Sequence, residues 1–370
     1  MREFKIFILS VFPAPYRVGV FNELGKEYDV TVYFEKSYDQ ERSKDWFENN
    51  FNNFKGGLLK NSEKESKSPK IEILTYLKAE KYDLVLAYDY VTPTAALLMT
   101  WCKFKRIPYA VNCDGGFIKQ NFFKKQIKKI FIENASLCLA GGENAMKYFL
   151  YYGAKEKNIY LHNFSSVNDY ELLKKPIEIN EKKKIREELG MRSNKIAISI
   201  GQFIYRKGFD VLIKAWANVN PEYELFIIGG GSKEKEYTQL MQSLKLNNIK
   251  FIGFKNKEEL RKYYLACDLF ILPTREDIWG LVINEAMSYG LPVITTDKCV
   301  AGLELIKNNE NGFIVPVDNE IELFKKINYI LSDDNVARIM SNNNINKIKP
   351  YTIQNIAYSH IESIKKILLT

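Results

Sequence analysis

The residues best suited to chemistry lie in the stretch 273–297, where two acids, Asp277 and Glu285, are separated by seven residues. Asp277 belongs to a predicted loop, and Glu285 lies one turn inside a helix predicted to begin at Leu281. The start of such a helix directs free backbone N–H groups and the positive end of its dipole towards the loop, which favours a phosphate group. The stretch therefore combines carboxylates with a place for a phosphate.

The elements that must position these acids can be predicted from the apolar pattern. A short buried strand is expected at Leu269–Leu272, the helix ends at Gly290, and a second strand is expected at Pro292–Thr295. A strand, a loop, a helix and a strand follow one another. Without further information, this is also the pattern of an ordinary βαβ unit with a solvated acidic loop.

The stretch resembles the signature of family 4 of the glycosyltransferases, which are retaining, nucleotide-sugar-dependent enzymes of the GT-B fold. That signature is Glu-x7-Glu-Ala followed by Gly-x-Pro-Val, and Asp277 here replaces the first Glu. The resemblance implies that Asp277 faces the donor sugar, that Glu285 accepts the two ribose hydroxyls, and that the anomeric configuration is retained. It also implies donor contacts from the loop and the helix start: Glu276, Trp279, Gly280, Leu281 and Val282.

A basic segment, Arg206-Lys207-Gly208, follows a predicted strand that ends at Gly201 and precedes a helix. Breaking a sugar–phosphate bond leaves negative charge on the diphosphate, and cations that are already in place stabilise it. The resemblance gives this role to Arg206 and Lys207 and a donor contact to Gly201, although Gln202 stands where the family usually has Arg. The alternative is that both cations are simply solvated.

Two further turns fit the family pattern. The resemblance places Gly230, within the run Gly229–Gly231, where the backbone approaches the donor closely. It places Phe254 beside the nucleobase, and this ring either stacks on the base or packs in the core. The sequence contains no Asp-x-Asp pair, which agrees with a metal-independent reaction that needs no cofactor beyond the nucleoside-diphosphate sugar.

The first half of the chain opens with a strand, a proline-rich turn over Val11–Arg17, a helix and a second strand, in a Rossmann-like order. The resemblance places that turn beside the acceptor and the donor phosphates, so Arg17 is either an anion contact or a surface residue. Asp114 follows a strand predicted at Tyr109–Asn112. It is therefore either an acceptor-side residue at the carboxyl edge of the sheet or part of a tight turn.

The residues Lys119–Asn134 predict a basic amphipathic helix. Apolar residues recur on one face at helical spacing, and lysines occupy the other face: Lys124, Lys125, Lys128 and Lys129. Such a basic face can bind an anionic membrane surface. It can equally be a solvated face, with the apolar residues packed on the sheet.

We therefore expect an α/β protein with the GT-B fold, in which two Rossmann-like doubly wound domains face each other across a cleft. The expected parts are an acceptor-binding domain over 1–165, a linker over 166–180, a nucleotide-sugar domain over 181–350 and a C-terminal helix over 351–370 that can pack back on the first domain. No apolar run is long enough to span a membrane.

The composition indicates which partners and which cellular compartment to expect. The net charge of +9 favours anionic partners, and no nucleic-acid motif accompanies it. Five cysteines without a Cys-x-x-Cys pair indicate a reduced, cytoplasmic protein, and the two histidines indicate structural roles.

These observations favour a metal-independent glycosyltransferase, peripheral on the inner face of the cell membrane, that acts on a glycan or lipid-linked acceptor. A nucleotide-sugar 2-epimerase of the same fold and a non-catalytic partner subunit are the alternatives.

Overall fold

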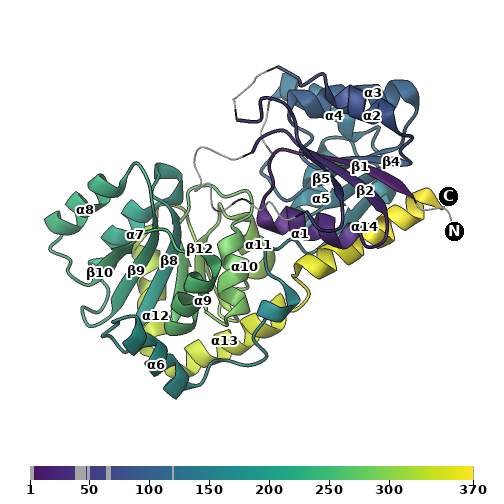
Figure 1. The fold of residues 1–370 in the computed structure, drawn as a ribbon. Coiled ribbons are helices and arrows are strands. Elements are labelled where there is room, and N and C mark those ends of the chain that lie inside the picture. Colours follow the sequence, from purple (N-terminus) through teal and green to yellow (C-terminus); the bar gives the residue numbers. More distant parts are fainter. Residues whose placement is uncertain (1–3, 38–46, 48–50, 64–67, 119–120, 370) are drawn as a thin grey trace. The chain divides into compact units, whose positions relative to one another are not determined.

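The computed structural model describes residues 4–37, 47, 51–63, 68–118 and 121–369. They form two compact units, one made of residues up to Ser166 together with those from Tyr351 onward, the other of Val167–Pro350. Each unit is a parallel sheet flanked by helices (Figure 1). The predicted linker, 166–180, is part of the second unit from Val167 and contains the short helix η3 (Asp169–Glu171).

In the described part of the first unit, seven parallel strands have the order β3-β2-β1-β4-β5-β6-β7. They are β1 (Lys5–Ser10), β2 (Asp29–Phe34), β3 (Lys55–Leu58), β4 (Leu84–Ala87), β5 (Tyr109–Cys113), β6 (Leu137–Ala140) and β7 (Ile159–Leu161). The flanking helices are α1 (Pro15–Leu24), α2 (Ile73–Ala79), α3 (Pro93–Lys105), α4 (Phe122–Ile132), α5 (Glu143–Tyr151), η2 (Glu156–Asn158) and α14 (Ile353–Leu368). Strands such as β4 are buried throughout, as expected for a parallel sheet that is covered by helices.

The second unit contains a six-stranded parallel sheet in the order β10-β9-β8-β11-β12-β13. Its strands are β8 (Ile196–Gln202), β9 (Glu224–Gly230), β10 (Ile249–Ile252), β11 (Leu269–Leu272), β12 (Val293–Thr296) and β13 (Gly312–Val315). Its helices are α6 (Ile179–Glu188), η4 (Tyr205–Lys207), α7 (Phe209–Trp216), α8 (Glu234–Ser243), α9 (Lys257–Ala266), α10 (Leu281–Ser288), α11 (Val300–Leu305), α12 (Glu320–Ser332) and α13 (Asp334–Ile348).

Each sheet reverses its strand order at one place, between β1 and β4 in the first unit and between β8 and β11 in the second. In doubly wound sheets, ligands bind outside the carboxyl ends of the strands at such a point. The segments that follow these four strands are therefore the first places to look for a site.

Several elements differ from the sequence-based expectation. Helix α1 begins at Pro15, inside the predicted proline turn, because proline fits the first position of a helix. Strand β3 lies within the polar stretch 36–70, for which the sequence pattern predicts no strand. The sequence predicts the last strand from two segments, Ile306–Asn309 and Gly312–Val315, and only the second forms a strand, β13. Helices α11 and α13 were not predicted.

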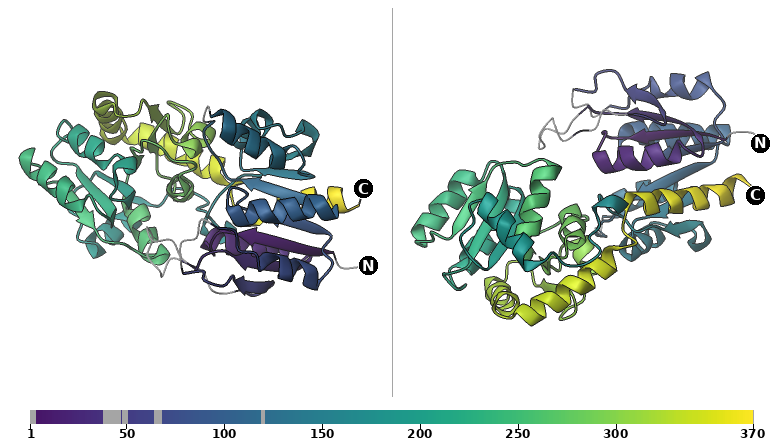
Figure 2. Two further views of the ribbon diagram at one scale, coloured as in Figure 1. Left: turned by 90° about the horizontal axis from the view of Figure 1, so that it is seen from above. Right: turned by 60° about the horizontal axis from the view of Figure 1, so that its bottom comes forward.

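Helix α14 packs along α1 in the first unit (Figures 1 and 2). The Tyr28 hydroxyl donates to the Ile361 carbonyl at 3.2 Å. His360 of α14 is buried beside His162, with ring centroids 4.8 Å apart. Burial lowers the pKa of His162 to about 3 and that of His360 well below its usual value, so both rings are neutral core groups at neutral pH.

The five cysteines are all buried and free. Burial raises the pKa of the Cys299 thiol to about 12, which makes this group unreactive. In the part of the chain that the structure describes, no helix has both the length and the apolar character needed to span a membrane.

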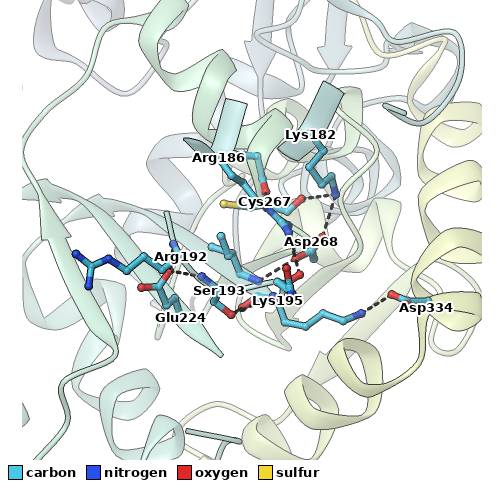
Figure 3. A network of polar contacts seen from close by, with 12 residues as sticks. Lys182, Arg186, Arg192, Ser193, Lys195, Glu224, Cys267, Asp268 and Asp334 are labelled. Atoms are coloured by element: carbon cyan, nitrogen blue, oxygen red, sulfur yellow. Dashed lines mark hydrogen bonds and ion pairs between the residues drawn. The ribbon is translucent and has the colours of Figure 1, made fainter. Parts of the chain in front are cut away.

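A polar network holds the amino-terminal edge of the second sheet (Figure 3). Asp268, which directly precedes β11, accepts hydrogen bonds from Arg186 Nη2 at 2.6 Å, Lys182 Nζ at 3.0 Å and the Ile196 backbone N–H at 2.9 Å. Arg186 also donates to two main-chain carbonyls. Helix α6 is thereby fixed to the starts of β8 and β11, at the edge opposite the carboxyl ends.

Changing Asp268 to Asn is expected to lower the free energy of unfolding by about 3–5 kcal/mol, because the buried Arg186 guanidinium loses its counter-charge. Chemical denaturation monitored by circular dichroism measures this change. Asp334→Asn is the matched control, since this carboxylate pairs with Lys195 but is 93% exposed. The control should change stability by less than about 1 kcal/mol; equal losses in both variants would contradict the role of burial.

Candidate functional site

Two loops meet at the carboxyl edge of the second sheet, at its switch point. The loop after β8 carries Arg206 and Lys207 in η4, and the loop after β11 carries Asp277. Lys207 Nζ lies 2.5 Å from Asp277 Oδ2, and Arg206 Nη1 lies 3.8 Å from the same oxygen. The Asp277 side chain is 11% exposed and that of Lys207 13%. The three residues that the resemblance marks as catalytic are thus adjacent.

Two glycines allow the loops to come this close. Gly208 has a φ of +69°, and a Cβ added to it would lie 2.1 Å from the Pro273 carbonyl oxygen. Gly280 has a φ of +99° at the start of α10, and its added Cβ would lie 2.8 Å from Cys299 Sγ. Any side chain at either position would push the loops apart or distort the start of the helix.

Arg275 ties the two loops together, although the sequence pattern did not single it out. Its guanidinium donates to both carboxylate oxygens of Asp210, at 2.9 and 2.7 Å, and lies 2.7 Å from Asp318. It also donates to the Tyr205 carbonyl at 2.7 Å and covers the Tyr205 ring, while its backbone N–H donates to the Arg206 carbonyl at 2.8 Å. Asp210 in the first turn of α7 gave no signal for Arg275, because the burial of this acid is known only from the structure.

Helix α10 places the predicted donor-binding residues in different surroundings. Glu285, Leu281 and Val282 are half-buried along its first turns, and Glu276 is half-buried in the loop before it. The Trp279 indole is buried and donates to Asn284 Oδ1 at 2.8 Å. The Trp279 side chain therefore belongs to the core of the unit, and a donor contact from this residue would have to come from its backbone.

The glycine turns lie beside this loop pair along the same sheet edge. Gly201 and Gly230 lie at the ends of β8 and β9, where Gly201 pairs with Gly229 and Gly230 pairs with Gln202. Phe254 is 59% exposed, and its ring would lie 3.3 Å from a Cβ added to Gly230. The alternative that Phe254 packs in the core is therefore wrong, and stacking on a nucleobase remains a prediction. Gln202 is half-buried at the end of β8.

In the first unit, Arg17 is buried rather than exposed. It forms ion pairs with Asp89 and, at 3.2 Å, with Asp114, and it donates to Ser10 Oγ at 3.1 Å. Three aromatic rings surround its guanidinium. The surface alternative for Arg17 is thus wrong, and two carboxylates already compensate its charge, which weakens the prediction that it contacts an anion.

Asp114 follows β5, and Asp89 follows the neighbouring strand β4 at the switch point of the first sheet; both pair with Arg17. Asn112 Nδ2 donates to Asp114 Oδ1 at 2.7 Å. Burial raises the pKa of Asp114, and the Arg17 charge opposes this shift. Asp89 was missed, although a strand is also predicted just before it, at Leu84–Ala87. Its position after a strand is the same as that of Asp114 and was a usable signal. Asp114 as an acceptor-side residue remains a prediction.

The faces of helix α4 that are buried and exposed differ from the prediction. Lys128 donates to the Tyr148 hydroxyl, and Lys125 Nζ lies 4.0 Å from the centre of the Tyr151 ring, so both lysines face α5. Ile127 and Ile130 are instead 59% and 49% exposed. The prediction that the apolar face packs on the sheet while the lysines are free is therefore wrong for these residues. Lys119 lies outside the described residues, as does the side chain of Lys124.

The two sheets and the paired loops define a class of protein. Residues 181–347 match the family described as glycosyl transferases group 1. Over these residues the second unit thus matches the group 1 glycosyltransferases, and the chain has the two-sheet GT-B fold.

Solved structures of low sequence identity share this fold. Sucrose-phosphate synthase from Thermosynechococcus elongatus superposes with a TM-score of 0.80 at 20% identity, over 100% of both chains. Anabaena HepE in complex with UDP and glucose superposes with a TM-score of 0.75 at 19% identity, over 98% of this chain and 100% of that one.

Curated relatives match over shorter lengths. An uncharacterized glycosyltransferase of Haemophilus influenzae is 29% identical over 50% of this chain and 51% of its own. A Campylobacter jejuni enzyme is 28% identical over 53% of this chain and 54% of its own, and its name is N-acetylgalactosamine-N,N′-diacetylbacillosaminyl-diphospho-undecaprenol 4-alpha-N-acetylgalactosaminyltransferase. The chain thus spans about half the length of these two relatives.

Proposed function

We propose that the protein transfers a sugar from a nucleoside-diphosphate sugar to a glycan or lipid-linked acceptor in cell-surface polysaccharide synthesis, with retention of configuration. The observation that carries this proposal is the cluster of Arg206, Lys207 and Asp277 at the switch point of the second sheet. The complex of HepE with UDP and the lipid-linked substrate in the name of the Campylobacter enzyme support the choice of donor and acceptor class.

The proposed chemistry assigns each residue a physical task. Lys207 and Arg206 meet the negative charge that grows on the diphosphate as the glycosidic bond breaks. Asp277 faces the donor sugar, and Glu285 accepts hydrogen bonds from the ribose. In the structure, Lys207 and Asp277 neutralise each other, so a buried diphosphate would compete with Asp277 for the ammonium group.

A donor screen followed by product analysis tests the function. The sugars of UDP, GDP, ADP and dTDP are screened by thermal shift, and the one that stabilises the protein is incubated with lipid-linked and glycan acceptors. Transfer of the sugar with retained configuration is expected. Conversion of the donor without an acceptor would instead identify a 2-epimerase, and the absence of any nucleotide binding would identify a non-catalytic partner subunit. The names of the relatives favour neither alternative.

The proposed reaction needs no divalent metal, because the basic side chains and the α10 terminus supply the positive charge. We expect donor hydrolysis or transfer to keep its rate within about twofold in EDTA. Initial rates are measured with chelator and after addition of magnesium or manganese. Complete loss of activity with EDTA that either metal restores would refute the metal-free mechanism.

We also propose that α4 docks the first unit on an anionic membrane. It exposes Ile127 and Ile130, which are one turn apart, and Phe122, at 70% exposure. These apolar side chains can enter the headgroup region, and the exposed Lys129 lies next to Ile130 in the sequence. In this proposal the membrane is the inner face of the cell membrane, where a lipid-linked acceptor would be located.

Changing both Ile127 and Ile130 to Gln is expected to reduce co-sedimentation with phosphatidylglycerol vesicles at least fivefold, since two apolar side chains no longer leave water. Ile321 and Ile339 on the second unit are similarly exposed, so the corresponding double Gln variant is the matched control. Lys129→Gln should weaken sedimentation mainly at low salt. Equal sedimentation of all variants would leave α4 as a solvated helix.

A further inference from the structure

Helix α9 presents a buried phenol to the acid predicted to bind ribose. The Tyr264 hydroxyl lies 3.0 Å from Glu285 Oε2, and Tyr264 itself is 2% exposed. The two residues come from different helices: in the sequence, α9 precedes β11 and α10 follows it. This contact is independent of the loop cluster around Lys207.

The chemistry of the pair fixes the direction of the hydrogen bond. Burial and the Glu285 charge raise the pKa of Tyr264 well above its ordinary value, so the hydroxyl keeps its proton. The hydroxyl therefore donates and the carboxylate accepts, in a charge-assisted bond. Glu285 is half-buried, so one of its oxygens is held from inside the unit while the side chain still reaches the surface.

The Tyr264 side chain, which donates this hydrogen bond, is also held rigidly. The Tyr264 ring stacks on the Tyr289 ring, with centroids 5.3 Å apart and planes inclined by 16°, and it contacts the Phe270 ring of β11. An aromatic side chain held in this way has lost its rotamer freedom during folding. A hydrogen bond to so rigid a group restricts the long Glu285 side chain before a ligand binds.

We propose that Tyr264 is a positioning residue for the nucleotide: its hydroxyl holds the Glu285 carboxylate in the orientation that accepts the ribose hydroxyls. This inference rests on the proposed function, since it needs Glu285 to contact ribose. It adds a specificity determinant, because the preference for a ribose over a deoxygenated sugar then depends on a residue that does not touch the nucleotide.

Calorimetry with the full chain tests the proposal. The probes are UDP, GDP and ADP, and for the tightest of them its 2′,3′-dideoxy form. Tyr264→Phe should weaken binding of the ribonucleotide about three- to tenfold and change binding of the dideoxy form less than about twofold. Tyr263→Phe is the matched control, being the neighbouring buried tyrosine on α9, and it should bind both probes like wild type.

The Glu285→Ala variant tests the ribose contact of Glu285 itself, apart from the role of Tyr264. It should weaken ribonucleotide binding at least tenfold and abolish the preference over the dideoxy form, and adding Tyr264→Phe should then have no further effect. If Glu285→Ala binds like wild type, or no nucleoside diphosphate binds at all, the proposed function fails first.

If Glu285→Ala loses the preference but Tyr264→Phe keeps it, only the role of Tyr264 is overturned. Equal weakening of both probes by Tyr264→Phe would also overturn it, because it would show a general packing effect. Thermal unfolding of each variant confirms that the measurements are made on folded protein.

Discussion

Lys207→Ala is expected to reduce kcat about 10²- to 10³-fold while changing the donor KM much less. The reason is that Lys207 Nζ, in a nearly buried position 2.5 Å from Asp277, would meet charge that is largest on the diphosphate in the transition state. An interaction that strengthens between ground state and transition state appears in kcat. Steady-state kinetics with the donor identified by the thermal-shift screen measures the effect.

The loss of activity in Lys207→Ala must be distinguished from a loss of stability. Removing Lys207 leaves the Asp277 carboxylate without its nearest cation, which costs stability. Lys207→Ala combined with Asp277→Asn should recover stability but not activity. Lys214→Ala is the control for loss of a lysine, since Lys214 is 45% exposed and pairs with Glu320.

Arg206 offers the competing explanation. Its side chain is 44% exposed and lies 3.8 Å from Asp277, so its removal should cost less than that of Lys207. Full kcat in Lys207→Ala together with a large loss in Arg206→Ala would transfer the leaving-group role to Arg206. Full kcat in both variants would refute the proposed chemistry of this cluster.

That Arg206, Lys207 and Asp277 lie together could be predicted, because the backbone constrains the spacing of these residues in the sequence. Gly208 and Gly280 must be glycines for the loops to meet, so the cations and the acid stand at fixed distances from them in the sequence. Side chains without such a neighbour left no comparable signal. Arg275 lies between a threonine and two acids, and its partners Asp210 and Asp318 are far away in the sequence.

The missed helix α13 has a physical explanation. Its buried residues Met340, Asn344, Ile345 and Ile348 have helical spacing, but one of them is polar. Asn344 Nδ2 donates to the carbonyls of Leu291 and Asn311, at 2.7 and 2.8 Å, and so replaces an apolar contact with two hydrogen bonds. An asparagine-rich segment therefore reads as a loop until its partners are known.

Charge partners and helix orientation were the hardest features to predict. Arg17 read as an anion contact or a surface group because Asp89 and Asp114 are 72 and 97 residues away. On α4, cation–π and hydrogen-bond contacts with three tyrosines of the α5 region turn two lysines inward. Hydrophobic periodicity carries no information about such contacts.

Arg275→Ala is expected to lower kcat about 100-fold, because the loops that carry Lys207 and Asp277 would lose the group that holds them in register. Arg275 bonds Asp210 on one side and the carbonyls of the Lys207 loop on the other, and its side chain is only 13% exposed. A displacement of about 1 Å at a reacting centre costs about that factor. The loss of these charged hydrogen bonds should also lower the free energy of unfolding by about 1.5–3 kcal/mol.

Arg275→Lys distinguishes geometry from charge. Lysine keeps the positive charge but cannot bind Asp210 through two parallel hydrogen bonds, so this variant should lose nearly as much kcat as the alanine variant. Asp210→Asn should disrupt the same pair of residues. The double variant with Arg275→Ala should therefore have a kcat no lower than that of Arg275→Ala alone. Arg338→Ala, an exposed arginine on α13, is the control and should keep the wild-type rate. Wild-type kcat in Arg275→Lys would show that a nearby positive charge is sufficient and that the bidentate clamp does not position the loops.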